Sequence, residues 1–261
     1  MNLALVVGER RADGLHEVAN VLQRIELADR LTLEDGAGPA VEGFAEDTLV
    51  RAALERLAAA AGSEPRWRVE IEKEIPVAAG LGGGSADAAA ALAAANATLA
   101  EPLAAEELHE LAAGLGADVP FFLASGPQLA EGAGERLTPL DLPLDYAVVV
   151  ALEHGAVKRS TGDVYRRFDE LGSGAGFEAR RLALTGALAA RDLAALPPND
   201  LAPAAGPTPL VEELRAAGAF RADVSGAGPA VYALFRTAAE AEAAALALAP
   251  GADVWVTRPV W

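Results

Sequence analysis

The chain of 261 residues is 52% hydrophobic, which is enough for the core of one large domain or of two ordinary ones. Its 38 acidic and 21 basic residues give a net charge of -17, which argues against electrostatic binding to nucleic acid or to an anionic membrane. It has no cysteine and only three histidines, which excludes disulfides and cysteine zinc sites and disfavours a histidine metal site. Without a signal-peptide core or an apolar run of roughly 20 residues, we expect a soluble, cytoplasmic protein.

The first part of the chain predicts an antiparallel sheet followed by a helix. Asn2 to Val7 reads as an apolar strand, and a second extended run covers Leu15 to Leu33 after a polar turn. Asp47 is predicted to cap a helix whose apolar residues recur at helical spacing between Leu49 and Leu57, and Gly62 is placed to end it.

Three consecutive glycines, Gly82 to Gly84, lie between a predicted strand, Trp67 to Ile75, and a predicted helix at 86–99. Glycines let backbone N–H groups approach an anion closely, and the first turn of a helix adds unpaired donors and a partial positive charge. The segment therefore predicts a phosphate site, although it matches neither the Walker A nor the Gly-x-Gly-x-x-Gly spacing. The alternative is a plain turn in which Ser85 or Asp87 caps the helix.

The rest of the chain predicts a mixture of helices and strands. Helices are expected at 104–113, 177–195, 209–217 and 238–248, and strands at 146–152, 231–235 and 254–258. Gly114 is placed to end the first of these helices, and Thr237 with Glu240 forms a capping box for the last one. Prolines cluster near Leu140 to Leu144, which favours a domain boundary there.

Four short motifs stand out along this chain. They are Pro76 to Ala86, Gly116-Ala117-Asp118-Val119-Pro120-Phe121-Phe122, Asn199-Asp200-Leu201 and Ser225-Gly226-Ala227-Gly228. In this order and at this spacing they resemble the GHMP kinase superfamily, and the resemblance covers nearly the whole chain. Two further segments are similar to signatures of the superfamily members that act on a cytidyl-diphosphate sugar alcohol: Asp13-Gly14-Leu15-His16-Glu17, and Ser160-Thr161 with Val164-Tyr165.

The resemblance implies an α+β protein with the two-domain GHMP kinase fold. An N-terminal ATP-binding domain, residues 1–143, is expected to be like domain 2 of ribosomal protein S5, and a C-terminal domain, residues 144–261, to be a ferredoxin-like α/β sandwich. The implied reaction is ATP-dependent phosphorylation of the 2-hydroxyl of 4-diphosphocytidyl-2-C-methyl-D-erythritol, a step of non-mevalonate isoprenoid biosynthesis. The alternatives are another GHMP-type kinase, acting on homoserine or a mevalonate-like substrate, and a nucleotide-binding protein without catalysis.

In such kinases the glycine loop holds the phosphates of ATP. The residues that match this cofactor site are Pro76, Val77, Ala78, Ala79, Gly80, Leu81, Gly82, Gly83, Gly84, Ser85 and Ala86. Ser85 is also implied as a contact to a phosphate or to Mg²⁺. Ser225 to Gly228 is implied to support the loop, and the alternative is a tight turn before a strand.

Asp118 matches the catalytic aspartate of the family, a base that accepts the proton of the substrate hydroxyl. Taken alone, it would be interpreted as a turn residue or a helix cap. Substrate-binding positions are matched by Asn2, His16, Thr161 and Tyr165. The resemblance implies that His16 and Asn2 contact the cytidine and the sugar-like end and that Tyr165 stacks on the cytosine. Taken alone, His16 would be a turn histidine and Tyr165 a core aromatic.

Two positions depart from the family pattern. The first strand of the family carries Pro-Ala-Lys-hydrophobic-Asn-Leu, whereas this chain begins Met1-Asn2-Leu3, so the lysine would lie one residue before Met1. The loss of this charge beside Asp118 would weaken the stabilisation of the transition state by several kcal/mol. We therefore expect the natural chain to begin further upstream; the alternative is a degenerate kinase. Leu15 replaces the family's tyrosine, which removes one aromatic face for the cytosine and leaves the base to Tyr165, His16 and backbone groups.

Overall fold

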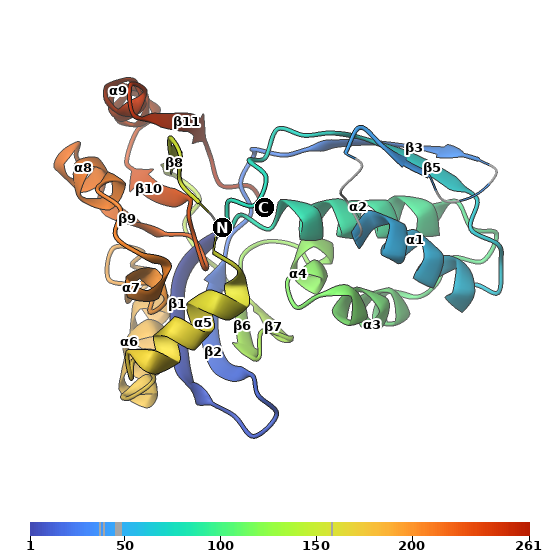
Figure 1. Cartoon of the computed structure of the whole chain (residues 1–261), viewed down its shortest axis with the longest axis horizontal. Coiled ribbons are helices and arrows are strands. Elements are labelled where there is room, and N and C mark those ends of the chain that lie inside the picture. The colour runs from blue at the N-terminus through green and yellow to red at the C-terminus, as the bar shows by residue number, and fades with distance from the viewer. Residues whose placement is uncertain (37, 39, 45–48, 158) are drawn as a thin grey trace. The chain divides into compact units, whose positions relative to one another are not determined.

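The computed structural model describes the chain apart from residues 37, 39, 45–48 and 158 (Figure 1). The described residues form two compact units, between which the chain passes several times. Unit 1 consists of Met1–Leu27, Ala78–Leu81 and Gly126–Trp261, and unit 2 of Ala28–Val77 and Gly82–Ser125. These units are defined by contacts, so the boundary expected between residues 143 and 144 stays a prediction. In the part of the chain that the structure describes, no helix is both long and apolar enough to cross a membrane.

Unit 1 is built on two four-stranded antiparallel sheets (Figure 1). The first has the order β1 (Asn2–Arg10), β2 (His16–Leu22), β6 (Gln128–Gly132) and β7 (Arg136–Pro139). The second has the order β11 (Ala252–Thr257), β8 (Ala147–Glu153), β10 (Val231–Phe235) and β9 (Arg221–Val224). The helices of this unit are α5 (Thr161–Glu170), α6 (Phe177–Ala189), α7 (Ala202–Ala205), α8 (Leu210–Ala216) and α9 (Ala238–Leu248).

Two clusters of buried apolar side chains lie among the described residues of unit 1. One joins the second sheet to α8 and α9, and Leu214 and Phe235 are fully buried within it. The other packs α5 and α7 against β1 and β2 and buries Val164 and Phe168 of α5. Because these two side chains are one helical turn apart, they fix which face of α5 is turned away from the core.

A buried polar network joins β9 to β1. The guanidinium of Arg221 donates to the carbonyl of Leu3 (2.9 Å) and to the hydroxyl of Tyr232 (2.7 Å), and that hydroxyl donates to the same carbonyl (2.6 Å). The remaining guanidinium nitrogens donate to the carbonyls of Leu196 and Pro197 (2.6 and 2.8 Å). The buried positive charge is therefore satisfied by fixed acceptors, which holds the first strand in place.

Unit 2 combines a three-stranded sheet with four helices. The sheet has the order β3 (Arg30–Asp35), β5 (Trp67–Glu72) and β4 (Ala40–Glu42), with β3 antiparallel and β4 parallel to β5. The helices are α1 (Leu49–Ala60), α2 (Gly83–Ala97), α3 (Ala105–Leu115) and α4 (Val119–Leu123). Figure 1 shows the sheet as a layer along α1 and α2, and buried side chains from all three enter one core. The buried residues of α2 are mostly alanines, whose small side chains let its neighbours approach closely.

The structure corrects several of the predicted elements. The run from Leu15 to Leu33 is not one extended segment, because β2 pairs with β1 and β6 whereas β3 pairs with β5 in the other unit. Gly114 lies within α3, and Gly116 is the residue that follows its end. The helix expected at 177–195 ends at Ala189, and Arg191 has a positive φ of 55°, which no helix can continue through.

Other predicted elements agree with the structure. The capping box is present, because Thr237 accepts from the backbone N–H of Glu240 and the Glu240 carboxylate accepts from that of Thr237. α1 covers the predicted helical segment, and Gly62 beyond its end has a positive φ of 62°. The predicted cap Asp47 lies outside the described residues. α4, α5 and α7 were not predicted, because short or charged helices lack a long apolar period.

Candidate active site

The second half of the glycine segment forms the start of α2 in unit 2. The helix begins at Gly83, three residues before the predicted start, and its N-cap Gly82 has a left-handed backbone with φ 77°. The first helical hydrogen bond runs from the N–H of Ala86 to the carbonyl of Gly82 (2.9 Å), so the preceding N–H groups point out of the helix end. No side chain caps this end, so a plain turn capped by Ser85 or Asp87 is the wrong interpretation.

Packing explains two of the three consecutive glycines. A Cβ on Gly82 would lie 3.1 Å from the ring of Phe122 on α4, and one on Gly83 would lie 3.1 Å from Cγ2 of Ile75. A Cβ on Gly84 would lie 3.7 Å from Leu49, which is an ordinary contact. Gly82 and Gly83 therefore bring the helix start close to its neighbours, whereas a Cβ at Gly84 would fit without crowding.

A buried ion cluster supports the approach to this helix. Lys73 donates to the carboxylates of Asp29 (2.5 Å) and Asp87 (2.7 Å), whose side chains are 1% and 2% exposed. The other oxygen of Asp29 accepts from the backbone N–H groups of Glu74 and Ile75 (2.7 and 2.8 Å). The cluster therefore joins the end of β5 to the first turns of α2. Asp29 and Lys73 were not predicted from the sequence, although a lysine two residues before Ile75-Pro76 was the available signal.

The electrostatics of this cluster follow from its burial. Burial raises the pKa of Asp87 to about 6, and the neighbouring charge of Asp29 adds to this rise, whereas the hydrogen bond from Lys73 opposes it. Burial works to lower the pKa of Lys73, but hydrogen bonds to Asp29 and Asp87 outweigh it and raise this pKa above its ordinary value. Two carboxylates thus share one cation, and the pKa of Asp87 stays raised although Lys73 donates to it.

The first half of the glycine segment, Ala78 to Leu81, belongs to unit 1. The carbonyl of Ala79 accepts from the N–H of Ala230 (2.9 Å), and the carbonyl of Gly80 accepts from the hydroxyl of Ser225 (3.1 Å). Gly80 has a φ of 86°, and a Cβ there would lie 2.8 Å from the carbonyl oxygens of both Ser225 and Gly228. Ser225 to Gly228 is a tight turn, closed by the bond from Gly228 N–H to the Ser225 carbonyl (2.9 Å), and it also contacts the segment. Both interpretations of this motif therefore hold.

Asn2 lies beside this turn at the beginning of β1. Its N–H donates to the hydroxyl of Ser225 (3.3 Å), and its side-chain amide donates to Asn20 on β2 (3.0 Å). The turn is itself held by Asn199, whose amide donates to the carbonyls of Val224 and Gly226 (3.0 and 2.6 Å). The Asn199-Asp200-Leu201 motif therefore contributes a structural contact to the Ser225–Gly228 turn.

Asp118 lies in unit 2, directly before α4. α4 packs on α2, and its Phe122 contacts the Gly82 position, so Asp118 and the start of α2 belong to one packed group of helices. Asp118 is the N-cap residue of α4 and lies in a turn closed by the bond from the Val119 N–H to the Gly116 carbonyl (3.1 Å), but its side chain makes no capping hydrogen bond. The residue as a whole is exposed, but protein atoms that displace water from its carboxyl raise the pKa of Asp118. A carboxylate with a raised pKa is a better proton acceptor than an ordinary one.

The other predicted substrate residues lie in unit 1, where the structure brings two of them together. The ring of His16, the first residue of β2, lies 4.9 Å from the ring of Tyr165 on α5. Thr161, the first residue of α5, is exposed. Asn2 is at the far end of the same hairpin, because Asn2 pairs with Leu22 whereas Arg10 pairs with His16. At about 3.3 Å per residue, the eight steps of β1 separate these ends by roughly 25 Å.

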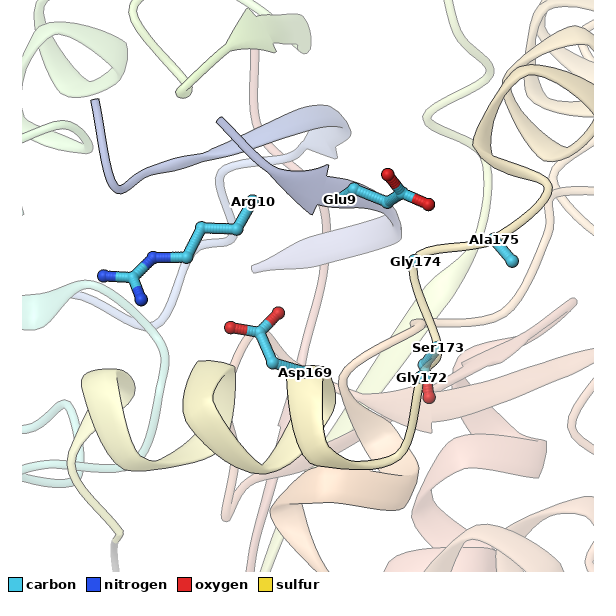
Figure 2. A pocket seen from close by; sticks show the side chains of 7 residues that line it. All are labelled: Glu9, Arg10, Asp169, Gly172, Ser173, Gly174 and Ala175. Atoms are coloured by element: carbon cyan, nitrogen blue, oxygen red, sulfur yellow. The ribbon is translucent and has the colours of Figure 1, made fainter. Parts of the chain in front are cut away.

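A small cavity of about 130 Å³ lies beside His16. It is lined by Glu9, Arg10, Asp169, Gly172, Ser173, Gly174 and Ala175 (Figure 2). Asp169 also accepts a hydrogen bond from the His16 ring, with 2.7 Å between Oδ1 and Nε2. Asp169 was not predicted from the sequence, although Tyr165, Phe168 and Asp169 are spaced as one helical face.

The described residues contain no group of three or more histidine, cysteine, aspartate or glutamate side chains that could hold a metal ion. Magnesium, however, is usually held by one or two protein carboxylates and by substrate phosphates, and in phosphate-binding loops a serine or threonine hydroxyl also contacts it. A single hydroxyl at the end of a helix, such as that of Ser85, therefore fits a magnesium ion carried by phosphates.

Two family models match the chain. GHMP kinases N terminal domain matches residues 48–126, and GHMP kinases C terminal matches residues 206–252. These matches lie on either side of the predicted boundary at 143 and 144 without locating it. They agree with the predicted two-domain α+β fold.

The chain is similar over most of its length to named relatives. It is 41% identical to 4-diphosphocytidyl-2-C-methyl-D-erythritol kinase of Streptomyces coelicolor, with 88% of this chain and 83% of the relative covered. A crystal structure of 4-(cytidine 5'-diphospho)-2C-methyl-D-erythritol kinase matches with a TM-score of 0.82 at 34% identity, covering 100% of this chain and 96% of that one. Homoserine kinase from Cytophaga hutchinsonii matches with a TM-score of 0.66 at 19% identity and coverages of 97% and 93%, which shows a shared fold alone.

Proposed function

Since the chain belongs to the GHMP kinases, and among them to the 4-diphosphocytidyl-2-C-methyl-D-erythritol kinases, we propose that it phosphorylates the 2-hydroxyl of 4-diphosphocytidyl-2-C-methyl-D-erythritol. It is an ATP-dependent small-molecule kinase of isoprenoid biosynthesis. The proposed partners are this substrate and ATP, in the cytoplasm, with neither nucleic acid nor a membrane involved.

The length of the β1–β2 hairpin is the observation that carries the choice of substrate. Asn2 and His16 lie at its opposite ends, roughly 25 Å apart along β1. A substrate that contacts both must be long, as a nucleoside diphosphate joined to a sugar alcohol is. Homoserine and mevalonate are too short to span the hairpin. The contact of His16 with Tyr165 supports a base-binding end, since aromatic rings stack on nucleobases.

We assign the phosphates of ATP to Pro76 through Ala86. The outward-pointing N–H groups at the start of α2 are suitable donors for phosphate oxygens, and the dipole of this 15-residue helix favours negative charge at the same end. The Ser225–Gly228 turn holds Ala79 and Gly80 by hydrogen bonds, so it supports the first half of the segment. A protein with a net charge of -17 needs such a local device to bind a polyanion.

Asp118 is proposed as the general base. The oxygen of the substrate 2-hydroxyl forms a bond to the γ-phosphorus of ATP, the bond from that phosphorus to the β-γ bridging oxygen breaks, and ADP leaves. The hydroxyl proton passes to the Asp118 carboxylate. The raised pKa of Asp118 favours this acceptance. Mg²⁺, when bound with ATP, supplies charge neutralisation at the phosphates, and the Ser85 hydroxyl is the proposed protein contact for it.

Asn2, His16, Thr161 and Tyr165 are the proposed substrate contacts. His16 and Tyr165 hold the cytosine end, and Asn2 lies where the hairpin meets the Ser225–Gly228 turn, beside the first half of the ATP segment. The sugar-alcohol end is therefore assigned to Asn2. Thr161 begins the helix that carries Tyr165, which supports assigning its hydroxyl to the nucleotide half of the substrate.

The test is turnover of defined acceptors by the purified chain. ADP release is measured with ATP and 4-diphosphocytidyl-2-C-methyl-D-erythritol, homoserine or mevalonate, and phosphorus NMR identifies the phosphorylated hydroxyl. We expect turnover of the cytidyl substrate alone, and a loss of about 100-fold or more in kcat for Asp118→Asn. Asp145→Asn, which removes an exposed carboxylate elsewhere, is the matched control. Faster turnover of homoserine or mevalonate would overturn the substrate, and ATP binding without ADP release would favour the non-catalytic alternative.

A further inference from the structure

His16 is held by a carboxylate from another element. Its side chain is 6% exposed, and Nε2 lies 2.7 Å from Oδ1 of Asp169, the second-last residue of α5. Figure 2 shows Asp169 extending from α5 toward the end of β1, where Glu9 and Arg10 lie. All of these residues belong to unit 1, so the pair is formed within one compact body.

The helix that carries Asp169 is fixed by its own packing. Phe168, the neighbouring residue, is buried in the cluster with Val164, and its ring meets the His16 ring edge-on at 5.9 Å. Tyr165, one helical turn earlier, covers His16 at an interplanar angle of 33°. The imidazole is therefore restrained by two rings and a hydrogen bond, so its two nitrogens have fixed directions.

The hydrogen bond decides which nitrogen carries the hydrogen. A carboxylate oxygen only accepts hydrogen bonds, so in the neutral ring Nε2 must be the donor. The second nitrogen, Nδ1, is then an acceptor. Within the described part of the chain, Nδ1 has no protein hydrogen-bond partner, and it is not among the buried unpaired atoms. It is thus free to accept a hydrogen bond from a ligand.

We propose that Asp169 is a positioning residue that fixes this tautomer of His16 and thereby makes the enzyme select cytosine over uracil. The inference rests on the proposed function, in which His16 lies at the base-binding end. Cytosine presents an amino group at its 4-position, which donates to an acceptor such as Nδ1. Uracil presents a carbonyl oxygen there, so two acceptors would face each other. A buried polar mismatch of this kind discriminates strongly between related ligands.

The test compares the cytidyl substrate with its uridyl analogue. We expect the wild-type chain to favour the cytidyl substrate in kcat/KM by at least about tenfold, and Asp169→Ala to lose most of this preference, because either nitrogen of His16 can then carry the hydrogen. Asp169→Glu keeps a carboxylate and should retain more of the preference than the alanine variant. Glu170→Gln removes the next, exposed carboxylate of α5 and should leave the ratio unchanged. A merely structural role for Asp169 would lower both activities equally.

A second measurement reads the tautomer directly in the ligand-free protein. Nitrogen NMR of the three histidines, with His16 assigned by substitution, should show hydrogen on Nε2 and not on Nδ1 in wild type, and a mixture in Asp169→Ala. Hydrogen on Nδ1 in the wild type would overturn the inference, as would an unchanged ratio in a folded Asp169→Ala variant. Failure of the wild type to phosphorylate either nucleotide substrate would instead overturn the proposed function.

Discussion

Gly80→Ala and Gly84→Ala make the same chemical change at two places in one glycine segment. Gly80 has a φ of 86°, and its new Cβ would lie 2.8 Å from two backbone carbonyl oxygens, those of Ser225 and Gly228. A left-handed alanine costs roughly 1–2 kcal/mol, and crowding against backbone adds about 1–3 kcal/mol. The reduced freedom of the unfolded chain returns about 0.4–1 kcal/mol. We expect Gly80→Ala to lower the free energy of unfolding by about 2–4 kcal/mol.

The control differs because Gly84 lies in an ordinary helical conformation. Its new Cβ would meet only Leu49, at 3.7 Å, and alanine is favoured over glycine in helices by up to about 1 kcal/mol. Thermal unfolding by circular dichroism should show a fall of roughly 4–15 °C for Gly80→Ala and no fall for Gly84→Ala. Equal midpoints for the two variants would refute the assignment of Gly80 as a close-contact position against the Ser225–Gly228 turn.

Three other changes test separate features. Leu15 is 53% exposed beside His16, and Leu15→Tyr should lower KM for the cytidyl substrate by at least about fivefold with KM for ATP unchanged, since base stacking on an aromatic ring contributes about 1–3 kcal/mol. Arg221→Met removes the donor from the carbonyls of Leu196 and Pro197 and from the Tyr232 hydroxyl, and should lower stability in urea by about 3 kcal/mol or more. Arg166→Met, at an exposed ion pair, should change it by less than about 1 kcal/mol. Burial raises the pKa of Asp87 to about 6, so between about pH 4 and pH 6 the folded carboxyl keeps a proton that the unfolded one loses. The stability of wild type relative to Asp87→Asn should therefore fall as the pH rises from about 4 to about 6. Urea midpoints of the two proteins that stay parallel across that range would contradict this.

The parts of the site that sequence reasoning located are those whose chemistry is local. Adjacent glycines before an alanine-rich helix indicate a phosphate site because backbone donors and the helix start are neighbours in the chain. Even so, the predicted helix start was three residues too late, because Gly83 and Gly84 have low helix propensity. The glycines at the helix start are explained only by tertiary contacts, those of Gly82 with Phe122 and of Gly83 with Ile75.

The parts that sequence reasoning missed depend on residues that are far apart in the chain. Lys73 meets Asp29 across a separation of 44 residues, and His16 meets Asp169 across 153. A single charged residue on a strand end or a helix carries no local signal for its partner, so such pairs follow only from the fold. The run from Leu15 to Leu33 was likewise predicted as one extended segment, because nothing in its own pattern indicates that β2 and β3 enter different sheets.

The glycine segment is one motif in the sequence, but different contacts hold its two halves in the structure. Ala78 to Leu81 is held by the Ser225–Gly228 turn in unit 1, and Gly82 to Gly84 is held by packing around α2 in unit 2. A substitution at Gly80, in the first part, would destabilise the fold by straining the backbone and crowding two carbonyl oxygens. A substitution at Gly83 would instead crowd the side chain of Ile75. The two parts can therefore be weakened independently, although both are assigned to the same triphosphate. An effect on ATP binding from either part identifies a phosphate-binding role only when the stability of that variant has been measured as well.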